Sequence, residues 1–233
     1  MPSLTRRLTA EALGTFGLVF VGAAVVVVNG GFPNSGIGLL GIALAHAVVL
    51  SVMISATMTI SGGHLNPAVT VGLLVARRID ALSALAYVVT QLVAACVAAY
   101  LVKLLLPANA VRDALLGVPV IAGSVSLNQA IGLEAVLTFF LVSAVFGTAV
   151  SPDAPRVAGF GIGLVLLFDI LVGGPLTGAA MNPARAFGPA AVSGQWVGQG
   201  VYWIGPIVGG ILAALLWEYV LLPRTPPRRR KTD

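Results

Sequence analysis

The stretch Ser61-Gly62-Gly63-His64-Leu65-Asn66-Pro67-Ala68 has a counterpart later in the chain, Thr177-Gly178-Ala179-Ala180-Met181-Asn182-Pro183-Ala184. Asn, Pro and Ala keep the same register in both copies, and each copy lies between long apolar segments. Apolar segments interrupted by Gly and Pro at corresponding places in two chain halves are typical of a solute site near the middle of a membrane. A single Asn-Pro-Ala could be merely a helix start, but the paired context favours a shared functional role.

Composition supports a membrane location. Hydrophobic residues make up 58% of the 233 residues, charged residues only 9%, and the mean hydropathy is +1.01. These values exclude an ordinary soluble domain. Six stretches are long enough to span roughly 30 Å of hydrocarbon. They are residues 8–28, 37–59, 82–106, 128–149, 157–174 and 200–222. We therefore predict an all-α membrane protein with six transmembrane helices.

Two further apolar pieces, 67–76 and 183–193, are too short to span and begin at the two Asn-Pro-Ala motifs. Since a backbone at membrane depth must have its polar groups satisfied inside the protein, these pieces are predicted to be buried, re-entrant half-helices. The repeat extends further, because Glu11-Ala12-Leu13-Gly14-Thr15-Phe16 resembles Glu134-Ala135-Val136-Leu137-Thr138-Phe139. Three spans per unit is an odd number, which predicts two inverted three-helix repeats. The expected division is a first repeat at 1–106, a connecting loop at 107–127, a second repeat at 128–222 and a basic tail at 223–233.

Basic residues predict the orientation in the membrane. With six spans, most of them fall on one side, and only Lys103 and Arg112 fall on the other. The positive-inside rule then places both termini in the cytoplasm, and we expect the cell (plasma) membrane. The tail residues Arg228 to Lys231 could bind nucleic acid, but their place favours a topology signal, so no nucleic-acid partner is expected. The first apolar run exceeds a signal peptide and is kept as a span.

Inverted symmetry brings the N-termini of the two half-helices together near the bilayer centre, where their positive dipole ends converge. Proline suits the first helical position and asparagine suits the N-cap. If each Asn oxygen accepts from helix amides, the NH₂ groups of Asn66 and Asn182 remain as donors to the lumen. A solute oxygen would accept from both, while cations and protons would be disfavoured there.

The motif regions Ser61 to Thr70 and Met181 to Ala190 resemble the major intrinsic protein family, the aquaporins and aquaglyceroporins, and the resemblance covers nearly the whole chain. It implies an aquaporin-like fold, a homotetramer with one pore per subunit, and a selectivity filter near the outer mouth. Carried over by position, the filter consists of His46, Ile170, Ala179 and Arg185. This set is similar to that of plant tonoplast intrinsic proteins and suggests a wider opening than a strict water filter.

Several polar residues allow a second interpretation. Arg185 could be a structural cation in a buried pair, although no acid lies near it in sequence, and His46 could be a helix-packing hydrogen bonder. His64 is expected to brace its loop. Glu11 and Glu134 could carry protons, but their symmetric placement favours carboxylates that accept backbone N–H groups before each half-helix, as the resemblance also implies.

The expected function is a passive water channel that excludes protons and ions and also passes small neutral solutes such as hydrogen peroxide, ammonia or urea. A glycerol-conducting aquaglyceroporin is the alternative, although Ala186 stands where such channels have Asp. An ion-coupled secondary transporter is more distant, because it would need acidic groups at the solute site. No catalytic residues, metal site or cofactor are expected. The expected partners are water, small solutes and the lipid bilayer. Asp169 adjoins Ile170 and should point away from the pore.

Overall fold

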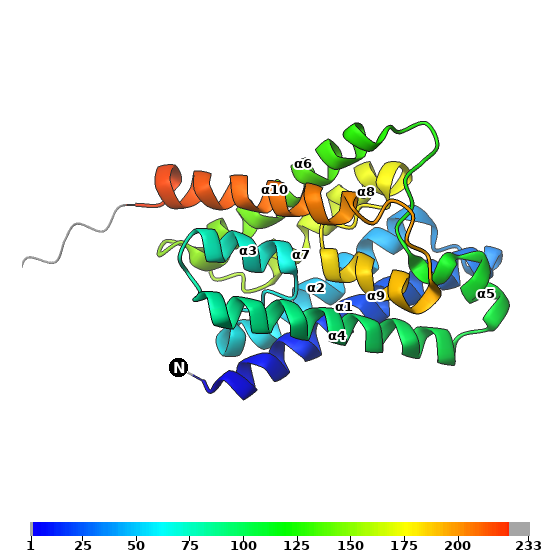
Figure 1. Cartoon of the computed structure of the whole chain (residues 1–233), viewed down its shortest axis with the longest axis horizontal. Coiled ribbons are helices and arrows are strands. Elements are labelled where there is room, and N and C mark those ends of the chain that lie inside the picture. The colour runs from blue at the N-terminus through cyan, green and yellow to red at the C-terminus, as the bar shows by residue number, and fades with distance from the viewer. Residues whose placement is uncertain (1, 224–233) are drawn as a thin grey trace, which may run out of the picture.

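The computed structural model describes residues 2–223, which form helices joined by turns (Figure 1). Six helical stretches are long and apolar enough to cross a membrane, and the predicted all-α, six-span fold is confirmed. The elements in chain order are α1 (Leu4–Gly31), η1 (Pro33–Ser35), α2 (Gly38–Ser61), α3 (Pro67–Val75), α4 (Ala81–Leu105), α5 (Ala108–Asp113), η2 (Leu115–Gly117), α6 (Leu127–Val145), η3 (Phe146–Val150), α7 (Phe160–Gly163), α8 (Val165–Thr177), α9 (Pro183–Ser193), α10 (Val201–Leu216) and η4 (Trp217–Leu221).

The fifth span differs from its predicted bounds at both ends. Instead of 157–174 it covers Phe160–Thr177, as the short α7 followed by α8. The prediction ended this span at residue 174, yet the helix continues until Gly178, whose φ of 79° is the left-handed conformation that closes it. Pro175 lies inside the last turn of α8 and lacks the N–H that would bond to the carbonyl one turn earlier.

The connecting segment 107–127 also differs from the expected irregular loop, since it contains α5 and η2. Packing against α1 explains these elements, because Ala110 of α5 lies so close to Gly31 that a side chain at position 31 would overlap it. Gly117 of η2 likewise lies against Ala23 of α1. The segment therefore folds back onto the helices instead of standing free in solvent.

Helix packing follows the inverted repeat. In the first repeat α1 packs against α2 and α4, and in the second α6 packs against α8 and α10. Each half-helix packs against the third span of the opposite repeat, α3 against α10 and α9 against α4. In Figure 1 the two half-helices lie between the long spans, so their N-terminal ends are inside the molecule. This exchange fixes the two Asn-Pro-Ala motifs relative to each other.

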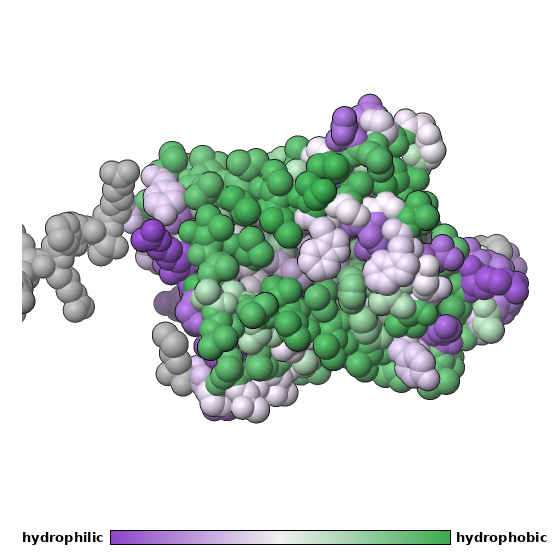
Figure 2. Space-filling model, viewed as in Figure 1, coloured by the Kyte–Doolittle hydropathy of each residue, from purple (hydrophilic) through white to green (hydrophobic). Residues whose placement is uncertain are grey.

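The face of the molecule seen in Figure 2 is largely apolar between two hydrophilic ends. At one end Arg78 donates from Nε and Nη2 to the Glu218 carboxylate, at 2.9 and 3.0 Å, and so joins the α3–α4 turn to η4. Asp80 caps α4 there, and its hydrogen bond from the Ser83 amide holds the Asp80 pKa below its usual value. The basic residues of the predicted tail, from Arg224 on, lie outside the described residues.

Candidate functional site

Both half-helices begin as their sequences predict. Asn66 is the N-cap of α3, and its Oδ1 accepts from the Ala68 amide at 2.8 Å. Asn182 is the N-cap of α9, and its Oδ1 accepts from the amides of Ala184 at 2.9 Å and Arg185 at 3.3 Å. A proline follows each Asn at the first helical position, where a missing N–H costs nothing. The two caps use the oxygen of each Asn side chain, so its NH₂ group is the polar group that remains.

These NH₂ groups are not wholly free, which corrects the sequence-based picture of two unengaged donors. Asn66 Nδ2 donates to the Met181 carbonyl, and Asn182 Nδ2 donates to the Leu65 carbonyl, both at 2.9 Å. Each motif is thus tied to the residue that precedes the other motif. An amide nitrogen carries two N–H groups, so one on each Asn is used in this cross-link and one is left over.

Glu11 organises the segment before α3. It is fully buried, and its Oε1 accepts from the Ser61 hydroxyl and the His64 amide, at 2.7 and 2.9 Å. Its Oε2 accepts from the Leu65 amide at 2.7 Å and from Gln91 Nε2 at 2.8 Å. Four donors therefore satisfy this carboxylate, two of them backbone amides of a non-helical stretch. These are the contacts expected of a carboxylate that braces a loop.

Glu134 makes the corresponding contacts before α9. Its Oε1 accepts from the Thr177 hydroxyl at 2.7 Å and the Ala180 amide at 3.0 Å, and its Oε2 accepts from the Met181 amide at 2.8 Å. A tyrosine hydroxyl completes each loop at 2.8 Å, from Tyr87 to the Ser61 carbonyl and from Tyr202 to the Thr177 carbonyl. The two bracing networks follow the same plan.

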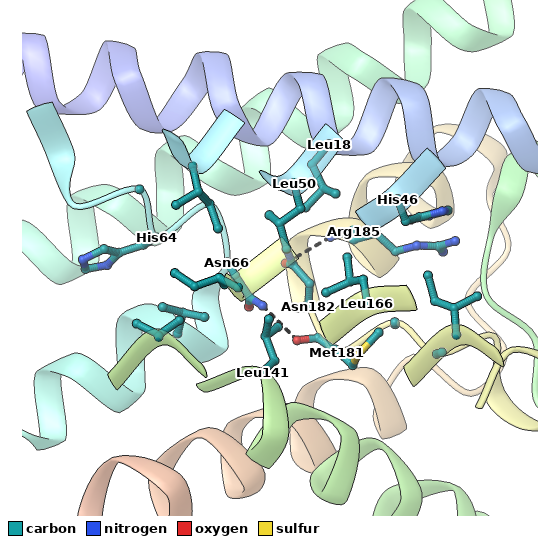
Figure 3. A pocket seen from close by; sticks show the side chains of 18 residues that line it. Leu18, His46, Leu50, His64, Asn66, Leu141, Leu166, Met181, Asn182 and Arg185 are labelled. Carbon is teal, nitrogen blue, oxygen red and sulfur yellow. Dashed lines mark hydrogen bonds between the residues drawn. The ribbon is translucent and has the colours of Figure 1, made fainter. Parts of the chain in front are cut away.

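A narrow cavity runs past both motifs. Its wall includes Asn66 and Asn182 together with apolar side chains such as Leu50 and Leu141. In Figure 3 the two Asn amides lie between His64 on one side and the pair His46 and Arg185 on the other. The predicted filter residues all line this cavity, namely His46, Ile170, Ala179 and Arg185. A second hollow adjoins this cavity and shares His46, Ile170 and Arg185 with it.

Arg185 and His46 are held by backbone carbonyls. Arg185 Nη1 donates to the Gly117 carbonyl at 3.0 Å, and among the described residues no acidic side chain forms a salt bridge with it. His46 Nδ1 lies 2.9 Å from the Ile42 carbonyl, which can only accept, so Nδ1 carries a proton. His46 Nε2 has no hydrogen-bond partner within residues 2–223. Arg185 keeps further N–H groups that could donate to a solute, whereas His46 Nε2 is buried against Gly22 of α1.

His64 and Asp169 complete the predicted polar residues. His64 Nδ1 lies 3.1 Å from the Thr70 hydroxyl, and the residue also lines the cavity, so it combines a contact that braces the loop with a place in the wall. Asp169 is not part of the cavity wall, as expected from its position beside Ile170. It is buried, and neither carboxylate oxygen has a hydrogen-bond partner among residues 2–223.

Other functional contacts escaped the sequence-based predictions. Gly117 is the main one, because the segment that carries it resembled a plain connecting loop. The hydroxyl residues Ser61 and Thr177 could have been found, since they stand at equivalent positions of the aligned repeat. Tyr87 and Gln91 gave no signal, because a tyrosine or glutamine in an apolar span is compatible with many packing roles.

Comparisons with known proteins agree with this geometry. The model of the family described as "Major intrinsic protein" matches residues 1–217. The chain belongs to the major intrinsic protein family. Among the relatives of this major intrinsic protein, "Aquaporin TIP4-4" of Zea mays is 43% identical over 222 residues, covering 91% of this chain and 85% of the relative. "Aquaporin TIP4-1" of Arabidopsis thaliana is 43% identical over 229 residues, covering 96% and 89%. The recognition from sequence is confirmed.

A solved structure supports the fold of this major intrinsic protein. The "X-ray structure of the aquaglyceroporin from Plasmodium falciparum" is 24% identical, with a TM-score of 0.82, and covers 94% of this chain and 97% of that chain. At this identity the likeness shows the shared fold alone. It bears on the arrangement of six spans and two half-helices, and not on which solute passes.

Proposed function

We propose that this major intrinsic protein is a passive water channel. The observation that carries the proposal is the pair of cross-linked asparagines at the wall of the cavity, where each amide has one N–H engaged with the opposite repeat and one left for a passing oxygen. Because both half-helix N-termini point to this place, their dipoles disfavour a cation or an excess proton. The names of the relatives, which are aquaporins, agree with this activity.

The filter is proposed to be His46, Ile170, Ala179 and Arg185. Arg185 repels cations at the constriction and donates to a neutral solute, while the His46 ring forms part of the wall beside it. Ile170 and Ala179 supply small, apolar walls, which leave more room than aromatic side chains would. We therefore expect hydrogen peroxide, and ammonia or urea, to pass with water, and glycerol to pass poorly. Glu11 and Glu134 are assigned to loop bracing and His64 to bracing with a share in the wall.

Two alternatives are less well supported. An aquaglyceroporin role would rest on the fold likeness to one such structure, which at 24% identity shows fold alone. A secondary transporter needs acidic groups for a coupling ion, and among the described residues that line the cavity there is no Asp or Glu. Groups of three or more His, Cys, Asp or Glu that could hold a metal are likewise absent from residues 2–223.

Assembly and orientation are also part of the proposal. We expect a homotetramer in the lipid bilayer, with one pore in each subunit and both termini cytoplasmic. Six spans place both ends of the described chain on one side, where Arg78 pairs with Glu218 and Arg7 Nε donates to Tyr87 at 2.8 Å. The names of the relatives carry the label TIP, so the expected plasma membrane receives no support from them.

Stopped-flow measurements on proteoliposomes test the function. The purified protein should raise water permeability with a low activation energy, independently of any ion gradient, and should pass urea and hydrogen peroxide more readily than glycerol. The double variant His46→Phe with Ile170→His should abolish urea passage while keeping water passage, with each single variant as its control. Water passage without urea or peroxide passage in the unmodified protein would refute the wide filter, and glycerol passage equal to that of urea would favour the aquaglyceroporin.

A further inference from the structure

Gly22 of α1 lies directly behind the filter histidine. A Cβ atom added at position 22 would come 2.6 Å from His46 Nε2 and 3.0 Å from His46 Cδ2. Real Cβ atoms do not approach other heavy atoms to 2.6 Å, and an imidazole ring has no flexible end that could bend away. The ring therefore occupies space that exists only because residue 22 has no side chain.

The His46 ring has little freedom to leave this place unless it turns. Its Nδ1 is held at 2.9 Å by the Ile42 carbonyl, one helical turn earlier on α2. The residue is buried and lines the cavity, so the side of the ring away from Gly22 faces the lumen and Arg185 (Figure 3). A ring displaced from α1 would move into the constriction.

The residue next to Gly22 supports the other polar filter group. A Cβ added to Gly117 would lie 2.8 Å from Ala23 Cα, so the backbone of η2 rests on α1 at this point. The Gly117 carbonyl accepts from Arg185 Nη1 at 3.0 Å. Two consecutive residues of α1 therefore contact the structures that hold His46 and Arg185, although α1 supplies none of the four filter side chains.

We propose that Gly22 is a specificity-determining positioning residue: by leaving space for the imidazole of His46 against α1, it sets the width of the filter. The inference rests on the proposed function, because it takes His46 to be a filter residue. Gly22 acts through His46 and does not itself need to touch the solute. Its replacement by alanine turns the ring towards Arg185 and narrows the path, with a larger effect on urea than on water because urea is the larger molecule.

The test is a double-mutant cycle of Gly22→Ala and His46→Ala, measured as urea and water permeability in proteoliposomes. Gly22→Ala should lower the ratio of urea to water permeability severalfold, because the displaced ring leaves less room for the larger solute. In the His46→Ala background, the same substitution should leave the ratio unchanged. Gly132→Ala is the matched control, because nothing lies within 4 Å of a Cβ at position 132 of α6.

An unchanged ratio in assembled Gly22→Ala protein, or an equal fall in both backgrounds, would overturn the inference, since the methyl group would then act through helix spacing. If Gly22→Ala fails to assemble, assembly of the double variant decides: rescue by His46→Ala supports the steric pair, and failure to rescue refutes it. If the unmodified protein passes water alone, the wide filter of the proposed function fails. In that case, the water permeability of Gly22→Ala, compared with and without His46→Ala, still tests the role of Gly22.

Discussion

Replacing Glu134 by Gln should destabilise the second re-entrant loop. The Glu134 carboxylate accepts three hydrogen bonds from Thr177, Ala180 and Met181. A glutamine has a single oxygen, so its NH₂ group must face at least one of these donors and leave it unpaired. The lost charge-assisted bond and the unpaired buried group together cost about 2–5 kcal/mol. For a chain of this length that corresponds to a fall in melting temperature of roughly 5–15 °C.

Thermal unfolding of the purified protein in detergent measures this effect, and water permeability in vesicles shows whether the loop still forms. Glu218→Gln is the matched control, because Glu218 pairs with Arg78 at a partly exposed end, with side-chain exposures of 21% and 42%. Such a pair contributes at most about 1 kcal/mol. Equal, small shifts for both variants would refute the bracing role. If Glu134→Gln instead loses proton flux at an unchanged melting temperature, Glu134 carries protons, which is the alternative that the sequence left open.

Three further outcomes are expected. Asn182→Asp should place a carboxylate against the Leu65 carbonyl, which accepts from the Asn182 amide in the unmodified protein. This change should lower the free energy of unfolding by about 1–3 kcal/mol and admit protons or cations. Assembled protein with unchanged water flux and no proton leak would contradict the model. Mercury should block the Ala179→Cys variant strongly and the unmodified protein weakly. The single cysteine of the unmodified protein, Cys96, does not line the cavity. Strong block of the unmodified protein would show that the filter is misplaced. Asp169→Asn should raise the melting temperature by a few degrees, since it removes a buried ionisable group without a partner in residues 2–223, and a lower value would reveal a stabilising interaction.

The spans and the starts of the half-helices were predictable because they depend on local properties. An apolar run of membrane length must become a helix whatever surrounds it, and Asn followed by Pro fits the first two positions of a helix through its own backbone chemistry. The extent of the fifth span was not local in this sense. The span was predicted to end at residue 174, whereas the helix closes at Gly178.

The groups that hold the side chains of the site in place were largely beyond sequence reasoning. The partner of the Asn66 amide is the Met181 carbonyl, 115 residues away, and a carbonyl group carries no signature of its own because every residue has one. The Gly117 carbonyl, which holds Arg185, lies in a segment whose helices form only by packing against α1. Contacts of this kind depend on the assembled fold.

Departures from the internal repeat identify the residues that distinguish the two ends of the pore. Counted from the two asparagines, Val69 and Arg185 occupy the same position of the two half-helices, and both line the cavity. The repeat requires a residue that faces the lumen at this place, but only the second copy carries a charge. Inverted symmetry puts the two positions on opposite sides of the asparagine pair. One side is therefore apolar at this position, and the other holds the cation of the proposed filter. The matching residues of the repeat predict the frame of the pore, and this mismatch predicts which side of it selects.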